Sequence, residues 1–150
     1  AFLPALRASD EARIVNLSSV YGLIAPPGQA AYSASKFAVR GFSNALRHEL
    51  AGSTVGVTVV HPGGVATAIA RRARVAPGVA PEELTRRMAQ AEKMLRLPPA
   101  RAAEIIVRAV EQGHARVLVG GDAVFIKPAD SAVDKMVDAL LRDATEEVAA

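Results

Sequence analysis

A hydroxyl, a phenol and an ammonium lie close together in the first quarter of the chain. Ser19 follows a short apolar run, and Tyr32 comes after a loop that contains Pro26 and Pro27. Lys36 stands four residues beyond Tyr32. Residues four apart on a helix share a face and lie about one turn from each other. The spacing therefore predicts a strand that ends in a serine, followed by a helix that brings a phenol and an amine back to that serine.

These three side chains could together move a proton to or from a reacting oxygen atom. A free phenol has a pKa of about 10, which is too high for an efficient base at neutral pH, and a nearby ammonium stabilises the phenolate. Lys36 has the spacing to do this for Tyr32. Tyr32 would then serve as a general acid or a general base. Ser19 would donate a hydrogen bond to the oxygen on which charge develops.

A second motif follows the next strand-like run, where residues 60–67 read Val-His-Pro-Gly-Gly-Val-Ala-Thr. Together with Ser19 and the Tyr-x-x-x-Lys pattern of residues 32–36, it resembles the short-chain dehydrogenase/reductase family. That family combines a serine, Tyr-x-x-x-Lys and a later Pro-Gly-x-Val-x-Thr stretch. A lone Tyr-x-x-x-Lys occurs by chance on many helices, whereas three matches in the right order are specific. The resemblance covers most of the chain, and residues 1–67 are its clearest part.

The resemblance implies an α/β fold, namely the C-terminal half of a doubly wound, Rossmann-like parallel sheet with about three strands and flanking helices. It implies an oxidoreductase that transfers a hydride between NAD or NADP and a small-molecule alcohol or carbonyl substrate. The implied catalytic residues are Ser19, Tyr32 and Lys36. Ser19 and Tyr32 would bind the substrate, and Tyr32 and Lys36 would contact the cofactor, with Lys36 on its ribose hydroxyls. The remaining cofactor contacts implied by the resemblance are Pro62, Gly63, Val65 and Thr67.

Several features of the family's cofactor half are missing from the 150 residues. The eleven glycines include no Gly-x-Gly-x-x-Gly spacing, which cradles phosphates in dinucleotide-binding folds. Asn16 and Asn44 are the only asparagines, so the family's Asn-Asn-Ala-Gly segment and its helix asparagine are absent. We therefore expect residues 1–150 to form a single partial domain, the catalytic half of a longer enzyme, inactive without the upstream half. The residue that selects NAD or NADP would lie upstream.

The amino-acid composition indicates what class of protein this is and which partners it is not expected to bind. Hydrophobic residues make up 51% of the chain and charged residues 22%, as in ordinary soluble domains. With no cysteine and three scattered histidines, neither a disulfide framework nor a metal site is expected. No apolar run is long enough to span a membrane, and the net charge of +3 comes from dispersed arginines, which do not form a nucleic-acid footprint. We expect a cytoplasmic protein that binds neither nucleic acid nor membrane.

Apolar periodicity and Gly/Pro positions predict alternating strands and helices, which indicate parallel β-α-β units with right-handed crossovers. The apolar run at 13–17 is typical of a strand buried on both faces. The expected strands are residues 13–17, 55–60 and 116–119, the second broken sharply at His61-Pro62. The expected helices are the end of one at 1–8, then 30–50, one beginning at Pro81, one at 101–112 and one at 131–141. The family resemblance implies that residues 68–112 form a lid-like helical insertion, and the apolar pattern predicts a C-terminal helix and tail at residues 131–150.

Other residues have both a functional and a structural interpretation. Tyr21 could line the substrate pocket or pack against the sheet edge. Ser18 is expected to cap the strand end rather than to act in catalysis, and His61 is expected to be structural because the phenol already supplies an acid-base group. Gly41 could allow close helix-to-helix approach or be merely tolerated. Five arginines of the insertion could attract an anion, but an exposed, solvated face is the preferred interpretation; they are Arg71, Arg72, Arg74, Arg86 and Arg87.

The sequence leaves two other functions open and predicts an assembly. The fold could survive as a non-catalytic interaction or regulatory module, or, less favoured, as a basic nucleic-acid binder. A strand at 13–17 without its upstream neighbour would leave an apolar edge that invites pairing. The helix at 30–50 builds a dimer contact in related enzymes. We therefore expect a homodimer or homotetramer, formed through that edge or that helix.

Overall fold

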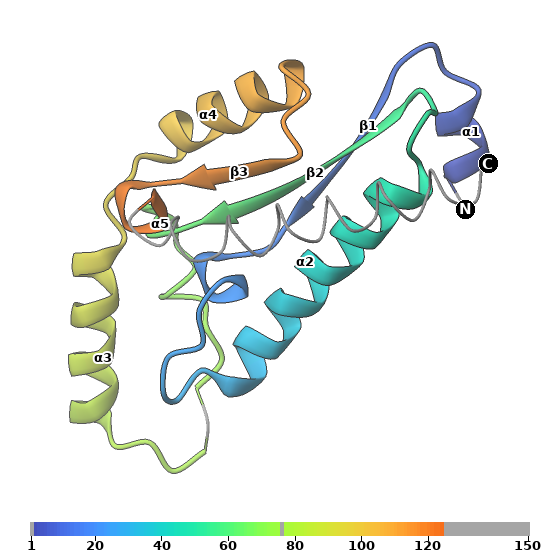
Figure 1. Ribbon diagram of the computed structural model, residues 1–150. Coiled ribbons are helices and arrows are strands. Elements are labelled where there is room, and N and C mark those ends of the chain that lie inside the picture. The colour runs from blue at the N-terminus through green and yellow to red at the C-terminus, as the bar shows by residue number, and fades with distance from the viewer. Residues whose placement is uncertain (1, 76, 125–150) are drawn as a thin grey trace.

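Three parallel strands form one open sheet in the computed structural model, which describes residues 2–75 and 77–124 (Figure 1). The strands are β1 (Ala12–Leu17), β2 (Val55–Pro62) and β3 (Arg116–Val119), in the order β1-β2-β3. The pairing of β1 with β2 runs from Ala12↔Val55 to Leu17↔Val60. That of β2 with β3 runs from Val59↔Arg116 to Pro62↔Val119. The predicted α/β class and parallel sheet are confirmed, whereas the helix and tail expected at 131–150 lie outside the described residues.

The helices begin and end close to the predicted positions. Proline at the first turn starts α3 and α4, where its missing N–H costs no hydrogen bond. Gly113, with a φ of 69°, follows the end of α4 in the left-handed region that favours glycine. The helical elements are α1 (Leu3–Arg7), a 3-10 turn η1 (Val20–Gly22), α2 (Ala30–Glu49), α3 (Pro81–Met94), α4 (Pro99–Glu111) and the short α5 (Gly121–Val124).

The sheet has a separate hydrophobic core on each face. Because successive side chains of a strand point to opposite faces, Val57 and Val60 of β2 belong to different cores. The core under α4 consists of Val60, Ala102, Ala109, Val117 and Val119. The core under α1 and α2 consists of Ala12, Leu50, Val55 and Val57, with Leu3, Leu6, Ile14 and Leu46 packed against them. Figure 1 shows α4 and α2 on either side of the sheet.

This arrangement corrects the expectation that both crossovers are right-handed. The chain moves across the sheet in one direction, from β1 to β2 to β3, but α2 and α4 cover opposite faces. Two crossovers that advance in the same direction over opposite faces must have opposite hands, so one of them is left-handed. The handedness rule describes short connections in which a single helix packs straight back onto the sheet. The connection from β2 to β3 departs from that case, because it passes through α3 before α4 reaches the sheet.

The expectation that β1 is buried on both faces is also wrong for the described chain. Along β1, exposed and protected residues alternate. Ala12 and Ile14 join the core under α1 and α2, whereas Val15 and Leu17 on the other face are 39% and 57% exposed. The reason is that α4 packs over β2 and β3 on that face.

The strand β2 runs two residues further than predicted. His61 and Pro62 stay in the ladder, paired with Leu118 and Val119. Proline lacks a donor, but the β1–β2 ladder ends at Val60, so Pro62 is paired with β3 alone, as on an edge strand, where proline is tolerated. The ladder is continued by Gly63, whose N–H donates to the Val119 carbonyl at 2.8 Å.

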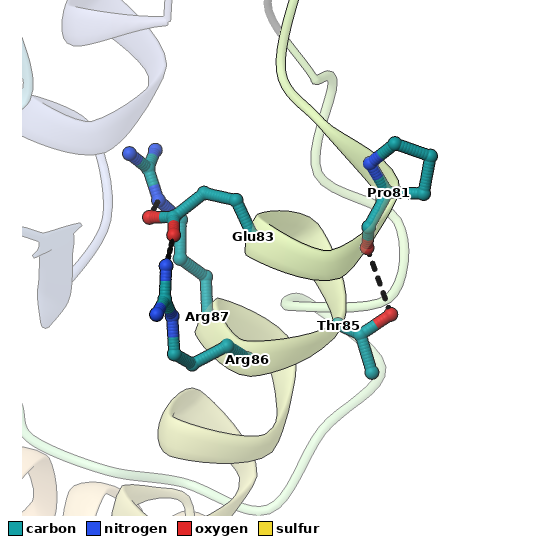
Figure 2. A network of polar contacts seen from close by, with 5 residues as sticks. All are labelled: Pro81, Glu83, Thr85, Arg86 and Arg87. Atoms are coloured by element: carbon teal, nitrogen blue, oxygen red, sulfur yellow. Dashed lines mark hydrogen bonds and ion pairs between the residues drawn. The ribbon is translucent and has the colours of Figure 1, made fainter.

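The helix α3 lies beyond the carboxyl ends of the strands and carries no buried residue (Figure 1). Figure 2 shows the polar contacts of its first turns, in which Arg86 and Arg87 both contact Glu83, and the Thr85 hydroxyl donates to the Pro81 carbonyl at 2.9 Å. Exposed ion pairs of this kind contribute about 0–1 kcal/mol each. They agree with a solvated face for these arginines. Whether residues 68–112 act as a lid stays a prediction.

We expect Val60→Ala to lower the free energy of unfolding by about 2 kcal/mol, because it removes two methyl groups from a fully buried site and leaves a cavity. The matched control is Val107→Ala on α4, where the side chain is 54% exposed and the change should stay within about 0.5 kcal/mol. Urea denaturation of both variants measures this. Equal losses would contradict the assignment of Val60 to the core under α4.

Candidate active site

The carboxyl ends of β1 and β2 bring both predicted motifs to one edge of the sheet. Ser18 and Ser19 follow β1 directly, and Pro62 ends β2. The Ser18 N–H donates to the Val60 carbonyl at 2.8 Å, so the two strand ends stay paired up to the serine. Ligands of open α/β sheets bind at this edge.

Ser19 is held firmly at the start of η1. It is the N-cap of that turn, and its hydroxyl oxygen accepts a hydrogen bond from the Tyr21 N–H at 3.2 Å. Its carbonyl accepts from the Gly22 N–H at 2.9 Å. Because the hydroxyl oxygen already accepts from the backbone, the hydroxyl proton is the part of this group suited to donate to a substrate.

His61 supports the same serine from the neighbouring strand. Its ring is fully buried, and Nδ1 lies 2.9 Å from the Ser19 carbonyl oxygen. A carbonyl oxygen can only accept, so Nδ1 carries the proton of this bond. The contact agrees with the structural role expected for His61, and it shows what that role is: the histidine of β2 fixes the backbone of the serine after β1.

Tyr32 and Lys36 lie one turn apart on α2, as their spacing predicts. The Lys36 ammonium donates to the Leu17 carbonyl at 3.2 Å and lies 5.6 Å from the centre of the Tyr32 ring. The ring of Tyr21 meets that of Tyr32 edge-on, with centres 6.0 Å apart and planes at 79°. Tyr21, Tyr32 and Lys36 therefore form one contact group at the end of β1. Ser19 is joined to it through the Tyr21 N–H.

The helix α2 is fastened to β1 by contacts that sequence reasoning missed. The Ser18 hydroxyl donates to the Lys36 carbonyl at 2.8 Å, so Ser18 does more than cap a strand end. The side chain of Asn16 donates to the Ser43 hydroxyl at 3.0 Å. Close approach at this junction requires Gly22, because a Cβ there would collide with the Ser18 hydroxyl and lie 2.9 Å from the Lys36 carbonyl. The small and polar residues on either side of Ser19, namely Asn16, Ser18 and Gly22, were the sequence signal for this close junction.

The Pro-Gly motif is tied to the residues just before α4. Val65 forms an isolated parallel bridge with Leu97, and the Ala66 N–H donates to the Leu97 carbonyl at 2.8 Å. The Thr67 hydroxyl accepts from the Ile69 N–H at 3.4 Å. The contacts of Val65 and Thr67 thus run toward the proposed lid, whereas Pro62 and Gly63 stay with the strand ends.

Asp122 belongs to this edge but was not among the predicted residues. Its Oδ2 accepts from the Gly64 N–H at 2.8 Å, across 58 positions of sequence. The rule that ligand sites gather at the carboxyl ends of parallel strands could have found it, since Asp122 follows β3 after two glycines.

The donor set at this edge fits the nicotinamide end of a dinucleotide. Lys36 offers an ammonium, Tyr32 and Thr67 offer hydroxyl groups, and all three are at least partly accessible. These groups suit ribose hydroxyls and a carboxamide. The glycine-rich turn that would hold the pyrophosphate is absent from the 150 residues.

Comparison with known proteins identifies the family. A sequence model described as short chain dehydrogenase matches residues 1–77, just over half of the chain. The chain belongs to the short-chain dehydrogenase/reductase family. The matched region includes both motifs, at residues 19–36 and 62–67.

Relatives and solved structures agree with this assignment. A protein of Mycobacterium tuberculosis named "Putative oxidoreductase SadH" is 51% identical over 129 residues, which cover 82% of this chain and 45% of the relative. A short-chain dehydrogenase/reductase of Burkholderia phymatum, solved in complex with NAD, matches with a TM-score of 0.66 and 27% identity over 98% of this chain and 52% of its own. One of Burkholderia cenocepacia, solved with NADP, has the same TM-score and identity over 94% of this chain and 51% of its own. The chain thus spans about half the length of these proteins.

The described residues contain neither a membrane-spanning helix nor a cluster of metal ligands. Among residues 2–75 and 77–124, no helix has the length and apolar character needed to cross a membrane. The same part of the chain contains no group of three or more histidine, cysteine or acidic side chains that could hold a metal ion.

We expect Gly22→Ala to destabilise the protein by about 1–3 kcal/mol, because the added methyl overpacks the junction between η1 and α2. Gly41→Ala is the matched control. No atom lies within 4 Å of a Cβ built there, and alanine in a helix is favoured over glycine by about 1 kcal/mol. Urea denaturation should therefore shift in opposite directions for the two variants. A Gly22→Ala variant as stable as the parent would contradict the close junction.

Proposed function

We propose that the intact protein is an NAD- or NADP-dependent oxidoreductase that acts on a small-molecule alcohol or carbonyl compound, with Tyr32 as its acid-base group. The observation that carries the proposal is the contact group at the end of β1. There the Lys36 ammonium sits 5.6 Å from the Tyr32 ring, the Tyr21 ring packs on Tyr32, and Ser19 is held by the Tyr21 N–H and by His61. Family membership supplies the reaction class.

Tyr32 would exchange the proton of the reacting oxygen. In reduction its hydroxyl gives a proton to the carbonyl oxygen as the carbon accepts a hydride, and in oxidation the phenolate takes the proton back. Lys36 is proposed to stabilise the negative charge that develops on the reacting groups, because its ammonium lies 5.6 Å from the Tyr32 ring and opposite charges attract. The Leu17 carbonyl orients the ammonium for this task, since it accepts one of its protons.

Ser19 would donate its hydroxyl proton to the same oxygen. Such a donor acts most strongly when it is preorganised, so that it need not reorient as charge develops. The cap at η1 and the His61 contact supply that preorganisation. Tyr21, packed edge-on against Tyr32, is proposed to line the substrate pocket from the same turn.

A bound nicotinamide would supply or accept the hydride. On this chain, Tyr32 and Lys36 are proposed to bind its ribose, and Pro62, Gly63, Val65 and Thr67 to contact the ring and its carboxamide. The complexes of the two Burkholderia proteins with NAD and with NADP support a nicotinamide cofactor. They do not favour one of the two.

The proposal extends to the assembly and the location of the protein. The helix α2 presents apolar side chains outward, among them Phe42, which is 62% exposed, and Phe37. We propose that the protein forms a homodimer or homotetramer through this face. A cytoplasmic location is proposed from the cysteine-free composition.

We expect Tyr32→Phe in the intact natural protein to lower kcat by about 10²–10⁴-fold, because it removes the acid-base proton and little else. Its thermal stability should remain near that of the parent, since the Tyr32 ring is 41% exposed and keeps its contacts. Cofactor affinity should fall far less than kcat, since the Lys36 ammonium proposed to bind the ribose remains. Alcohol oxidation and carbonyl reduction are followed by NAD(P)H absorbance. Undiminished turnover would refute the role of Tyr32, and failure of the parent to bind either cofactor would favour a non-catalytic module.

We expect Phe42→Glu to convert the oligomer to monomer, because a carboxylate in an apolar contact would be buried without a partner. Val107→Glu on α4 is the matched control, since this apolar residue is similarly exposed but lies on another helix. Light scattering measures the mass of each variant. A parent protein that is monomeric at high concentration would contradict the proposed assembly.

A further inference from the structure

The side chain of Asp122 bridges the ends of two strands. It belongs to the short turn after β3, and its Oδ2 accepts from the Gly64 N–H at 2.8 Å. Gly64 follows β2 and immediately precedes Val65. Hydrogen bonds to a charged acceptor are about twice as strong as those between neutral groups. The carboxylate therefore holds the turn at the point where the chain leaves the sheet for the proposed cofactor contacts.

Two glycines make room for this carboxylate. A Cβ built at Gly63 would collide with both carboxylate oxygens of Asp122. One built at Gly120 would lie 2.7 Å from Oδ1, and the φ of Gly120 is 105°, which disfavours any side chain. The backbones of β2 and β3 thus close around Asp122 from both sides. The glycines of this edge are explained by packing on the carboxylate as well as by approach of a ligand.

The opposite side of the same turn is held by backbone groups alone. The Gly64 carbonyl accepts from the N–H groups of Arg96 and Leu97, each at 2.9 Å. A Cβ at Gly64 would collide with the Met94 carbonyl. Gly64 is therefore clamped through its N–H by Asp122 and through its carbonyl by the residues after α3. Among these contacts, the Asp122 carboxylate is the one supplied by a side chain.

We propose that Asp122 is a positioning residue for cofactor binding, which acts by fixing the Gly63-Gly64 turn in the shape that presents Val65 and Thr67. The inference rests on the proposed function, because it assigns the turn to the nicotinamide end of the cofactor. Consecutive glycines have wide conformational freedom. Fixing them before binding lowers the ordering cost of binding. Asp122 touches neither Tyr32 nor Lys36 in the contacts that define this turn, so its effect is on cofactor affinity rather than on proton transfer.

The test uses Asp122→Asn and Asp122→Ala in the intact natural protein, with Glu111→Gln as the control. Glu111 ends α4 and leads to the start of β3, at the opposite edge of the sheet, so the control removes one carboxylate far from the turn. Two quantities are measured: the exchange rate of the Gly64 amide hydrogen by NMR, and the dissociation constants of NADH and NADPH by fluorescence titration. The melting temperature of each variant is recorded alongside.

We expect Asp122→Ala to speed exchange at Gly64 and to raise the cofactor dissociation constant, each about tenfold, as for loss of a hydrogen bond to a charged group. Asp122→Asn keeps an acceptor oxygen and should give a smaller change in both. Glu111→Gln should change neither. The maximal rate with saturating cofactor should fall far less than the affinity, which separates Asp122 from Tyr32.

The two readouts keep the inference and the proposed function apart. Unchanged exchange at Gly64 in Asp122→Asn and Asp122→Ala overturns the clamp, whatever the cofactor does. Faster exchange with an unchanged dissociation constant overturns the positioning role while the proposed function stands. A parent protein that binds neither cofactor would refute both the proposed function and the positioning role. The exchange rate of the Gly64 amide would then still show whether Asp122 holds the turn. If Asp122→Ala fails to fold, Asp122→Asn carries the same comparison.

Discussion

The hydrogen bond from the Ser18 hydroxyl to the Lys36 carbonyl joins the segment after β1 to α2, the two parts of the chain that carry the residues proposed to react. One end of it belongs to the residue before Ser19, and the other is the backbone of the lysine itself. The return bond from the Lys36 ammonium to the Leu17 carbonyl closes a small ring of contacts between β1 and α2. These two bonds fasten the turn of α2 that carries Lys36 to the end of β1. The glycine at position 22 is required because this ring leaves no room for a side chain.

The same principle operates at the next strand end, with different groups. There the His61 ring, the Gly64 backbone and the Asp122 carboxylate connect β2 with η1 and with the turn after β3. The residues proposed to react lie just after β1 or in the first turns of α2, whereas the groups that orient them come from β1, β2 and η1. A rigid parallel sheet thereby fixes loops that would otherwise be free to move.

Much of this arrangement was readable from the chain because it depends on local patterns. The strand at 116–119 and the helix beginning at Pro81 were predicted at their observed first residues, since apolar runs and proline act over a few positions. The spacing of Tyr32 and Lys36 predicted one face of one helix, and α2 places them one turn apart. The sequence did not show that α2 and α4 pack on opposite faces of the sheet, because contacts between residues far apart in sequence decide which face a helix covers. The role of Asp122 was not predicted for the same reason, since its hydrogen-bond partner Gly64 is 58 positions away in sequence. The exposure of Val15 and Leu17 was missed because an apolar run indicates what a strand can bury, not which neighbours cover it.

The middle strand, β2, contributes to both hydrophobic cores: Val55 and Val57 to one and Val60 to the other. Loosening of either layer therefore removes support from the second through a shared backbone. Elements coupled in this way lose their structure together rather than one at a time. The two cores should thus melt as one cooperative unit, and the contacts that hold Ser19, Tyr32 and Lys36 should be lost in the same transition.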